Sequence, residues 1–121
     1  MGKSKRIFWL AEPEEQDYPA ARSYLSLLYP DDAVITIMEA LRTRVVTQFA
    51  AKDIFRASGL SLLGVSNAHV EKDRKKIRKG IPLSPLLLVR AGDRVVIADG
   101  YHRLCAIYEA DEDIMIRAKI V

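Results

Sequence analysis

The sequence predicts a mixed α+β domain, and three observations lead to this prediction. Apolar, often β-branched runs of strand length occur at residues 45–50, 86–89 and 95–98. Apolar residues recur at intervals of three and four, the helical period, within residues 17–29 and 69–79. The chain of 121 residues is long enough for one hydrophobic core and too short for two independent ones. Because helical and strand patterns are interspersed, we expect helices packed on a sheet.

Residues 1–44 are predicted to form an arm and a helical hairpin that packs on the rest of the protein. The arm contains one apolar patch at residues 7–10, which we expect to dock as a short strand or clasp. A first helix is expected over residues 17–29 and is ended by Pro30, and a second helix follows it directly. We expect packing to be the role of both helices.

Residues 45–121 are predicted to form the main body of the protein. Glycines mark the ends of two helices, and a glycine turn joins two strands. The expected elements are a strand at 45–50, a helix at 52–59, a loop at 60–68, a basic helix at 69–79, strands at 86–89 and 94–98, a helix from Gly100 to about Ala110, and a last strand at 114–121.

Composition and charge restrict the classes of function. Half of the chain is hydrophobic and 29% is charged, as in ordinary globular proteins and unlike disordered ones. The net charge of +3 permits an acidic partner without requiring one. Cys105 is the single cysteine, so an internal disulfide is excluded. Since no apolar stretch approaches the roughly 18 residues of a membrane span, we expect a cytoplasmic protein that does not contact a membrane.

The turn at Gly100 carries the clearest functional pattern in the chain. The residues before it form an apolar run that indicates a buried strand, and those after it repeat at helical spacing. Backbone N–H groups at the start of such a helix bind anions, and phosphates above all. Asp99, His102 and Arg103 lie in the same turn, and histidine and arginine side chains donate to phosphate oxygens. We therefore expect an anion site at this turn.

Three blocks of the sequence match one family pattern. The first is a strand and short helix at residues 48–54, and the second is a basic helix followed by glycine, proline and an apolar strand at residues 72–89. The third is the sequence Val-Ile-Ala-Asp-Gly-Tyr-His-Arg-Leu-Cys-Ala at residues 96–106. The last block is similar to the signature D-G-H-H-R-x-x-A. Residues 45–121 thus resemble the ParB/sulfiredoxin-like family, which includes the N-terminal domain of chromosome-partitioning ParB proteins. Residues 1–44 lie outside the resemblance.

The resemblance implies a nucleotide or phosphate site at the turn, because family members include CTP-binding clamps, ATP-using sulfiredoxins and a kinase of free serine. Gly100, Tyr101, His102 and Arg103 would then bind the phosphates of ATP or CTP, with Mg²⁺, or of a phosphorylated small molecule. Asp99 and His102 would be the catalytic residues, with Asp99 holding a metal–phosphate group or polarising a hydroxyl.

Departures from the family pattern argue against particular activities. Tyr101 stands where sulfiredoxins have their reactive cysteine, and Cys105 follows about one turn later, where we expect it to be a buried apolar residue. No helix-turn-helix domain follows in this sequence, so we do not expect a partition protein. The serine kinase also needs an acid from earlier in the fold, for which Glu71 and Asp73 are the only candidates.

Three functions remain open. The protein is a nucleotide-dependent enzyme such as a phosphotransferase or hydrolase, a non-catalytic module that binds a nucleotide or phosphorylated ligand, or a nucleic-acid-binding or nuclease-like protein. In the third, basic residues 72–79 contact a phosphate backbone. No aromatic residue is interleaved with these charges, which favours a solvated helix face with Glu71 paired to Lys75.

A purely structural role for the turn is also open. In that alternative, Asp99 caps the following helix, while His102 and Arg103 pair with acids such as those at residues 111–113. A histidine and an arginine in the first helical turn oppose the helix dipole unless an anion is present. This conflict favours the anion site over the structural alternative.

Overall fold

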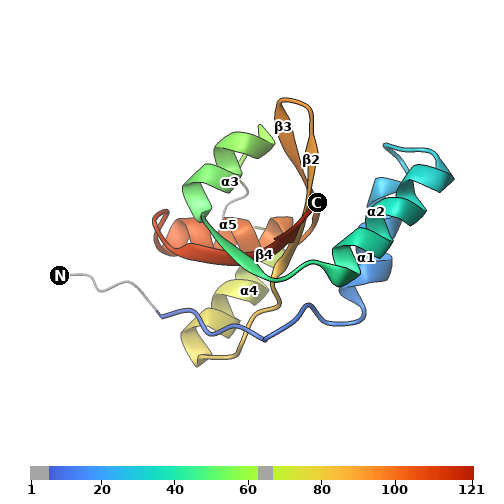
Figure 1. The fold of residues 1–121 in the computed structure, drawn as a ribbon. Coiled ribbons are helices and arrows are strands. Elements are labelled where there is room, and N and C mark those ends of the chain that lie inside the picture. The colour runs from blue at the N-terminus through green and yellow to red at the C-terminus, as the bar shows by residue number, and fades with distance from the viewer. Residues whose placement is uncertain (1–5, 63–66) are drawn as a thin grey trace.

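A computed structural model describes residues 6–62 and 67–121, and within them it contains five helices and one sheet of four strands (Figure 1). The elements are α1 (Asp17–Leu25), α2 (Asp31–Thr43), β1 (Thr47–Ala50), α3 (Ala51–Ser58), α4 (Ala68–Lys79), β2 (Leu86–Ala91), β3 (Arg94–Asp99), α5 (Tyr101–Ala110) and β4 (Met115–Ile120). Residues 1–5 of the expected arm and residues 63–66 of the expected loop lie outside the described residues.

The sheet is open and mixed, which confirms the α+β class. Its strand order is β1-β4-β2-β3. The outer pairs, β1 with β4 and β2 with β3, are antiparallel, whereas the central pair of β2 and β4 is parallel. The parallel pair requires a crossover, and β3 and α5 supply it between β2 and β4.

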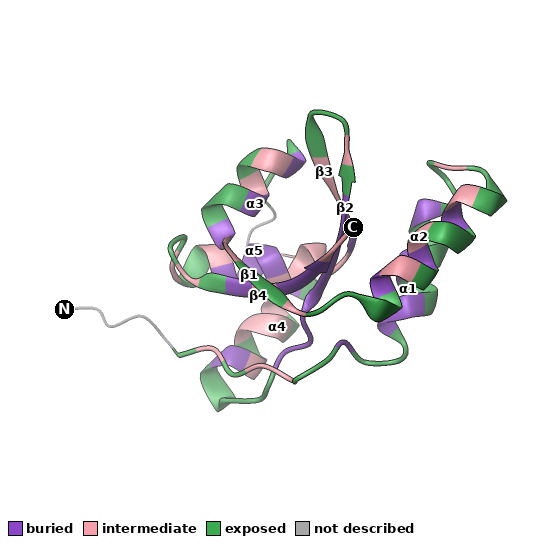
Figure 2. Cartoon of the chain, in the orientation of Figure 1, coloured by how far each residue is buried: buried purple, intermediate pink, exposed green. Residues whose placement is uncertain are grey.

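Strand β2 is buried on both faces, which explains why its sequence is continuously apolar rather than alternating. Leu86 and Leu88 pack in a core formed with α3, α4 and α5. Leu87 and Val89 face the opposite way, into a second core formed with α1 and α2. The helices therefore cover both faces of the sheet, and the buried residues gather between them and the strands (Figures 1 and 2).

Helix α5 lies at the centre of the larger core. Four consecutive residues, Leu104, Cys105, Ala106 and Ile107, are completely buried. The prediction that Cys105 is a buried apolar residue is confirmed. This packing anchors the middle of α5, and the first turn of the helix directly follows β3.

The N-terminal helices are attached to the sheet through apolar packing and one buried lysine. Lys119 of β4 is only 2% exposed, and its Nζ donates to the hydroxyl of Tyr18 at 3.2 Å and to the carbonyl of Arg42 at 3.0 Å. Its Nζ also lies 2.9 Å from Oε1 of Glu12. Burial lowers the pKa of Lys119, but the hydrogen bonds to Glu12 and Tyr18 outweigh burial and raise the pKa above its ordinary value. One cation thus joins the arm, α1 and α2.

The apolar patch of the arm docks as predicted. Trp9 forms an isolated parallel bridge with Leu83. The backbone N–H of Leu83 donates to the carbonyl of Phe8 at 2.8 Å, and the N–H of Leu10 donates to the carbonyl of Leu83 at 2.9 Å. The arm segment before α1 is therefore hydrogen-bonded through its backbone to the segment before β2.

Several element boundaries differ from the sequence prediction, among them the end of α1 and the start of β1. Helix α1 ends at Leu25 rather than at Tyr29, because the residues after Leu25 form tight turns in which Leu28 and Tyr29 both donate to the Leu25 carbonyl. Strand β1 begins at Thr47, and Val45 is 80% exposed outside the sheet.

In the part of the chain that the structure describes, every helix is too short or too polar to span a membrane.

Candidate functional site

The turn between β3 and α5 requires glycine. Gly100 has a φ of +108°, and a Cβ atom built there would lie 2.6 Å from Cγ of Leu86. Gly100 is the N-cap of α5, and within residues 6–62 and 67–121 no side-chain cap is found for this helix. The N–H of Leu104 makes the first intrahelical hydrogen bond, to the Gly100 carbonyl at 2.9 Å. The first turn of α5 therefore offers backbone N–H groups without a side-chain cap.

Asp99 does not cap α5, so that sequence prediction is wrong. Its Oδ2 instead accepts a hydrogen bond from Nη2 of Arg103 at 2.7 Å. A charged guanidinium one turn along the helix binds a carboxylate more strongly than a neutral amide does. The same contact corrects the expectation that Arg103 pairs with acids at residues 111–113.

A second carboxylate faces Arg103 from the N-terminal helices. Oδ2 of Asp17 lies 3.9 Å from Nη1 of Arg103, and the Arg103 side chain is only 14% exposed. Asp17 accepts hydrogen bonds from the hydroxyl of Ser84 and from the N–H of Glu14. Nε of Arg103 is buried and makes no hydrogen bond within the described residues. Sequence reasoning missed Asp17, which looked like an ordinary acid in the first turn of a packing helix.

A pocket of about 190 Å³ lies between this turn and α4, and charged side chains line most of it. Its lining contains three permanent cations and two carboxylates, so among the lining residues positive charge is in excess by one even when both histidines are neutral. Asp17, which faces Arg103, lies outside this lining. Helix α4 and the turn each supply four lining residues, which are His69, Lys72, Asp73 and Lys76 from α4 and Asp99, Gly100, His102 and Arg103 from the turn.

The start of α4 is capped by Asn67. Oδ1 of Asn67 accepts from the N–H of His69 at 2.9 Å and from that of Val70 at 3.2 Å. Glu71 takes no part in the pocket, because it pairs with Arg74 at 3.6 Å and with Arg78 at 3.1 Å. The predicted pairing of Glu71 with Lys75 is therefore wrong.

The two histidines meet across the pocket. The rings of His69 and His102 have centroids 4.9 Å apart and planes tilted by 44°. Burial, His69 and Arg103 lower the pKa of His102 below its ordinary value, while Asp73 opposes them. A neutral His102 is thus available as a hydrogen-bond donor or a proton acceptor near neutral pH.

Both carboxylates of the pocket hold their protons more strongly than ordinary aspartates. Burial raises the pKa of Asp73, although Arg103, Lys76 and His102 pull it down. Burial also raises the pKa of Asp99, and Asp17 adds to the rise, whereas the charge and the hydrogen bond of Arg103 act against it. Asp99 is held by Arg103, so Asp73 is the more accessible acid for chemistry in the pocket.

Tyr101 does not line this pocket with the rest of the predicted set. Its hydroxyl donates to the carbonyl of Ser61, on the segment that follows α3. Tyr101 instead lines an adjacent pocket of about 360 Å³ on the other side of the turn, which also contains Tyr24, Leu60 and Ile97.

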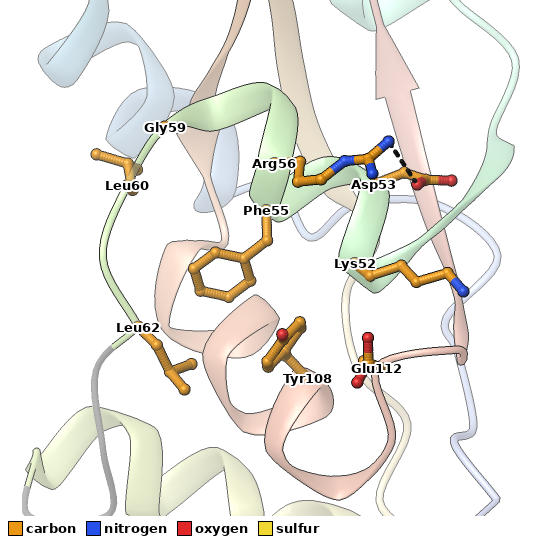
Figure 3. Close-up of a pocket in the computed structure, with 9 residues that line it drawn as sticks. All are labelled: Lys52, Asp53, Phe55, Arg56, Gly59, Leu60, Leu62, Tyr108 and Glu112. Atoms are coloured by element: carbon orange, nitrogen blue, oxygen red, sulfur yellow. Dashed lines mark ion pairs between the residues drawn. The ribbon is translucent and has the colours of Figure 1, made fainter.

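A larger pocket of about 600 Å³ lies at the opposite end of α5, away from the predicted residues (Figure 3). The rings of Phe55 and Tyr108 meet there with centroids 4.8 Å apart. Acidic neighbours offset its cations, since Lys52 lies 2.6 Å from Asp113 and Arg56 lies 3.8 Å from Asp53. This pocket therefore lacks the positive excess of the α4 pocket.

Over residues 6–62 and 67–121, no group of three or more histidine, cysteine, aspartate or glutamate side chains is arranged to hold a metal ion. Comparison of the chain with known protein families, with curated proteins and with solved structures finds no match.

Proposed function

We propose that the pocket between α4 and the β3–α5 turn binds the phosphate group of a nucleotide or a phosphorylated small molecule, in a domain of the ParB/sulfiredoxin-like type. One observation supports this proposal above the others. Lysines from one helix and the uncapped amino-terminal turn of another line the same small pocket. Each feature attracts an anion alone, and phosphate binding commonly combines them.

The charges indicate how the phosphate is held. Lys72 and Lys76 lie one turn apart on α4, so their ammonium groups reach the pocket from the same side. The start of α5, whose backbone N–H groups attract anions, borders the pocket through Gly100, His102 and Arg103. Arg103 is already held by Asp99 and Asp17, so it contributes positive potential behind the turn rather than a free two-pronged contact.

The size of the pocket favours the phosphate end of a ligand over a whole nucleotide. Sites for drug-sized ligands occupy roughly 300–1,000 Å³, whereas this pocket measures about 190 Å³. The remainder of the ligand must extend out of it. The ligand is thus recognised first by its charge and then by what lies beside the pocket.

A phosphotransferase or hydrolase is the catalytic form of this proposal. Asp73 and His102 are the acid–base pair that we propose for it, because both line the pocket. Burial raises the pKa of Asp73, and burial lowers the pKa of His102, which leaves its imidazole neutral and able to accept a proton. Asp99 would position Arg103 rather than react. Any Mg²⁺ would arrive with the phosphate oxygens of the ligand and meet Asp73 and Asp99 there.

Thermal unfolding in the presence of ligands tests the binding proposal. We expect inorganic phosphate, ATP or CTP, with and without Mg²⁺, to raise the melting temperature, because a ligand of the native state stabilises it. The double variant Lys72→Gln/Lys76→Gln should lose that increase. The matched variant Lys75→Gln/Lys79→Gln removes the same charge from exposed positions of α4 and should keep it. If no phosphate compound stabilises the wild-type chain, the proposal is wrong.

The variant Asp73→Asn separates binding from catalysis. It removes a negative charge from the pocket, so we expect it to bind phosphate several-fold more tightly than wild type. Release of inorganic phosphate from ATP or CTP, if the wild type performs it, should be abolished in Asp73→Asn. Phosphate release that persists in the variant would remove Asp73 from the catalytic proposal.

The nucleic-acid alternative makes an opposite prediction for the lysine variants. A duplex held along the exposed face of α4 would need Lys75 and Lys79. Salt-sensitive retention of DNA or RNA that is lost in Lys75→Gln/Lys79→Gln, without any response to small phosphate compounds, would favour that alternative.

A further inference from the structure

We infer that the ligand is a phosphomonoester whose organic part is flat, largely apolar and uncharged, and that this part lies in the adjacent pocket of about 360 Å³. The inference rests on the proposed phosphate site and adds the chemical class of the ligand to it. It follows from where the second pocket lies, from its lining and from its lack of positive charge.

The two pockets meet at the β3–α5 turn. Asp99, Gly100 and His102 line both of them. A phosphate bound at the amino-terminal end of α5 therefore has the second pocket directly beside it. A group esterified to that phosphate can therefore extend from the first pocket into the second along the residues that both pockets share.

Aromatic and aliphatic side chains form most of the second pocket. Ile97 and Ala98 of β3 are buried and make its base. Tyr24 of α1 and Leu60 after α3 make its sides, and they remain 42% and 44% exposed. Both are large apolar side chains that remain exposed to water beside the pocket. A ligand that covers them is stabilised, because it removes their apolar surface from water.

One of the aromatic walls is fixed in position. The hydroxyl of Tyr101 is bonded to the carbonyl of Ser61, so its ring cannot turn freely. The ring of His102 lies beside it, with centroids 5.7 Å apart and planes tilted by 48°. A rigid aromatic wall favours a flat ring, which loses little entropy when it stacks there.

The charges of the second pocket exclude a second anionic group. Among the described residues, no lysine or arginine lines it, and the one carboxylate in its lining, that of Asp99, is already paired with Arg103. An additional phosphate or carboxylate placed there would lose hydration without gaining a partner. The organic part is therefore expected to carry no charge.

Calorimetric titration of the full chain with three probes tests the inference. The probes are inorganic phosphate, 2-naphthyl phosphate and 2-naphthol, which separate the contributions of the phosphate and the ring. We expect 2-naphthyl phosphate to bind at least about tenfold more tightly than inorganic phosphate, as for a partly buried aromatic ring. We expect 2-naphthol to bind more weakly than 2-naphthyl phosphate.

Three variants locate the ring. Tyr24→Ala should reduce the advantage of 2-naphthyl phosphate by about three- to tenfold and leave the affinity for inorganic phosphate unchanged. Leu27→Ala removes another exposed apolar side chain just after α1, where the residue is 82% exposed, and should change neither affinity. Phe55→Leu alters the larger pocket at the other end of α5 and should also change neither.

The outcomes distinguish the two proposals. If inorganic phosphate and 2-naphthyl phosphate bind equally, the phosphate site stands and the inference about the ring is overturned. If the advantage of the ring depends on Phe55 and not on Tyr24, the inference is likewise overturned, because the ring then lies in the larger pocket. If none of the phosphate compounds binds, the proposed function itself fails.

Discussion

Asp17, the first residue of α1, faces Arg103 in the first turn of α5, with 3.9 Å between Oδ2 and Nη1. This contact connects the N-terminal helices, which lie outside the family resemblance, to the turn that carries the signature. Asp17 is 7% exposed, and Ser84, which donates to it, is 2% exposed. The N-terminal helices therefore do more than cover the sheet. They supply Asp17, one of the two carboxylates that form ion pairs with Arg103.

The variant Asp17→Asn tests this relationship. Asp17 contributes to the raised pKa of Asp99, so we expect the pKa of Asp99 to fall in the variant. We also expect a loss of about 1–3 kcal/mol in the free energy of unfolding, since buried hydrogen bonds to the carboxylate are weakened. An NMR titration of the Asp99 carboxyl carbon and urea unfolding measure the two effects. Asp31→Asn, which removes an exposed first-turn acid from α2, should produce neither.

Gly100→Ala should be destabilised by more than its backbone conformation alone explains. The variant would place Cβ 2.6 Å from Leu86 and 2.9 Å from Nη2 of Arg103. Gly92→Ala is a matched control, because Gly92 also has a positive φ, of +69°, but nothing lies within 4 Å of its Cβ position. We expect about 1 kcal/mol of lost stability for Gly92→Ala and at least about 2 kcal/mol more for Gly100→Ala. Equal losses in urea unfolding would show that the turn tolerates a side chain.

The lowered pKa of His102 predicts a pH dependence of stability. Its folded pKa lies below the ordinary value of about 6.5, so the unfolded chain takes up the proton more readily. The contribution of His102 is therefore fully present above about pH 6.5 and is lost as the pH falls from there through its folded pKa. Urea unfolding between roughly pH 5.5 and 7.5 measures this effect, and His102→Gln should flatten the decline. A decline of equal size in the variant would contradict the assignment.

A bound phosphate should act against the lowering of the His102 pKa. The anion adds negative charge beside His102, in addition to Asp73, and so favours the protonated imidazole. Binding of inorganic phosphate to the wild type should thus strengthen relative to His102→Gln as the pH is lowered through the histidine range. His69 and Arg103 also face His102 and act against its protonation, which makes this increase smaller than for an isolated histidine.

Lys119→Met should destabilise the attachment of the N-terminal helices. The substitution keeps most of the buried volume but removes the donor to the Arg42 carbonyl and to the Tyr18 hydroxyl. Glu12 is 63% exposed and can be hydrated after the loss. We expect a cost of about 1–3 kcal/mol, because the buried carbonyl and hydroxyl lose their partner. Hydrogen exchange should accelerate first in α1 and α2, and unchanged exchange there would contradict this role.

The sequence contained enough information to place the turn at Gly100 because its signals are local. A buried strand, a residue with positive φ and a helical repeat all depend on near neighbours, so the strand–glycine–helix unit could be predicted. The continuous apolar run at residues 86–89 similarly indicated a strand, and the structure shows that this strand is covered on both faces.

The partners of the charged residues could not be predicted in the same way. Helical periodicity assigns Asp17 to one face of α1. It does not reveal which residues of other elements, such as Arg103 of α5, that face contacts in the folded protein. The expectation that Asp99 caps α5 failed because Arg103 competes for the same carboxylate. The α4 side of the pocket was likewise hidden, since Lys72 and Lys76 were indistinguishable in sequence from the exposed lysines beside them.

An NMR titration of the isotopically labelled full chain with inorganic phosphate tests the central claim most directly. The account predicts saturable shifts in the backbone amides of residues 101–103, together with shifts in the side chains of Lys72, Lys76 and His102. The absence of any saturable shift, or shifts centred instead on the exposed Lys75 and Lys79, would contradict it.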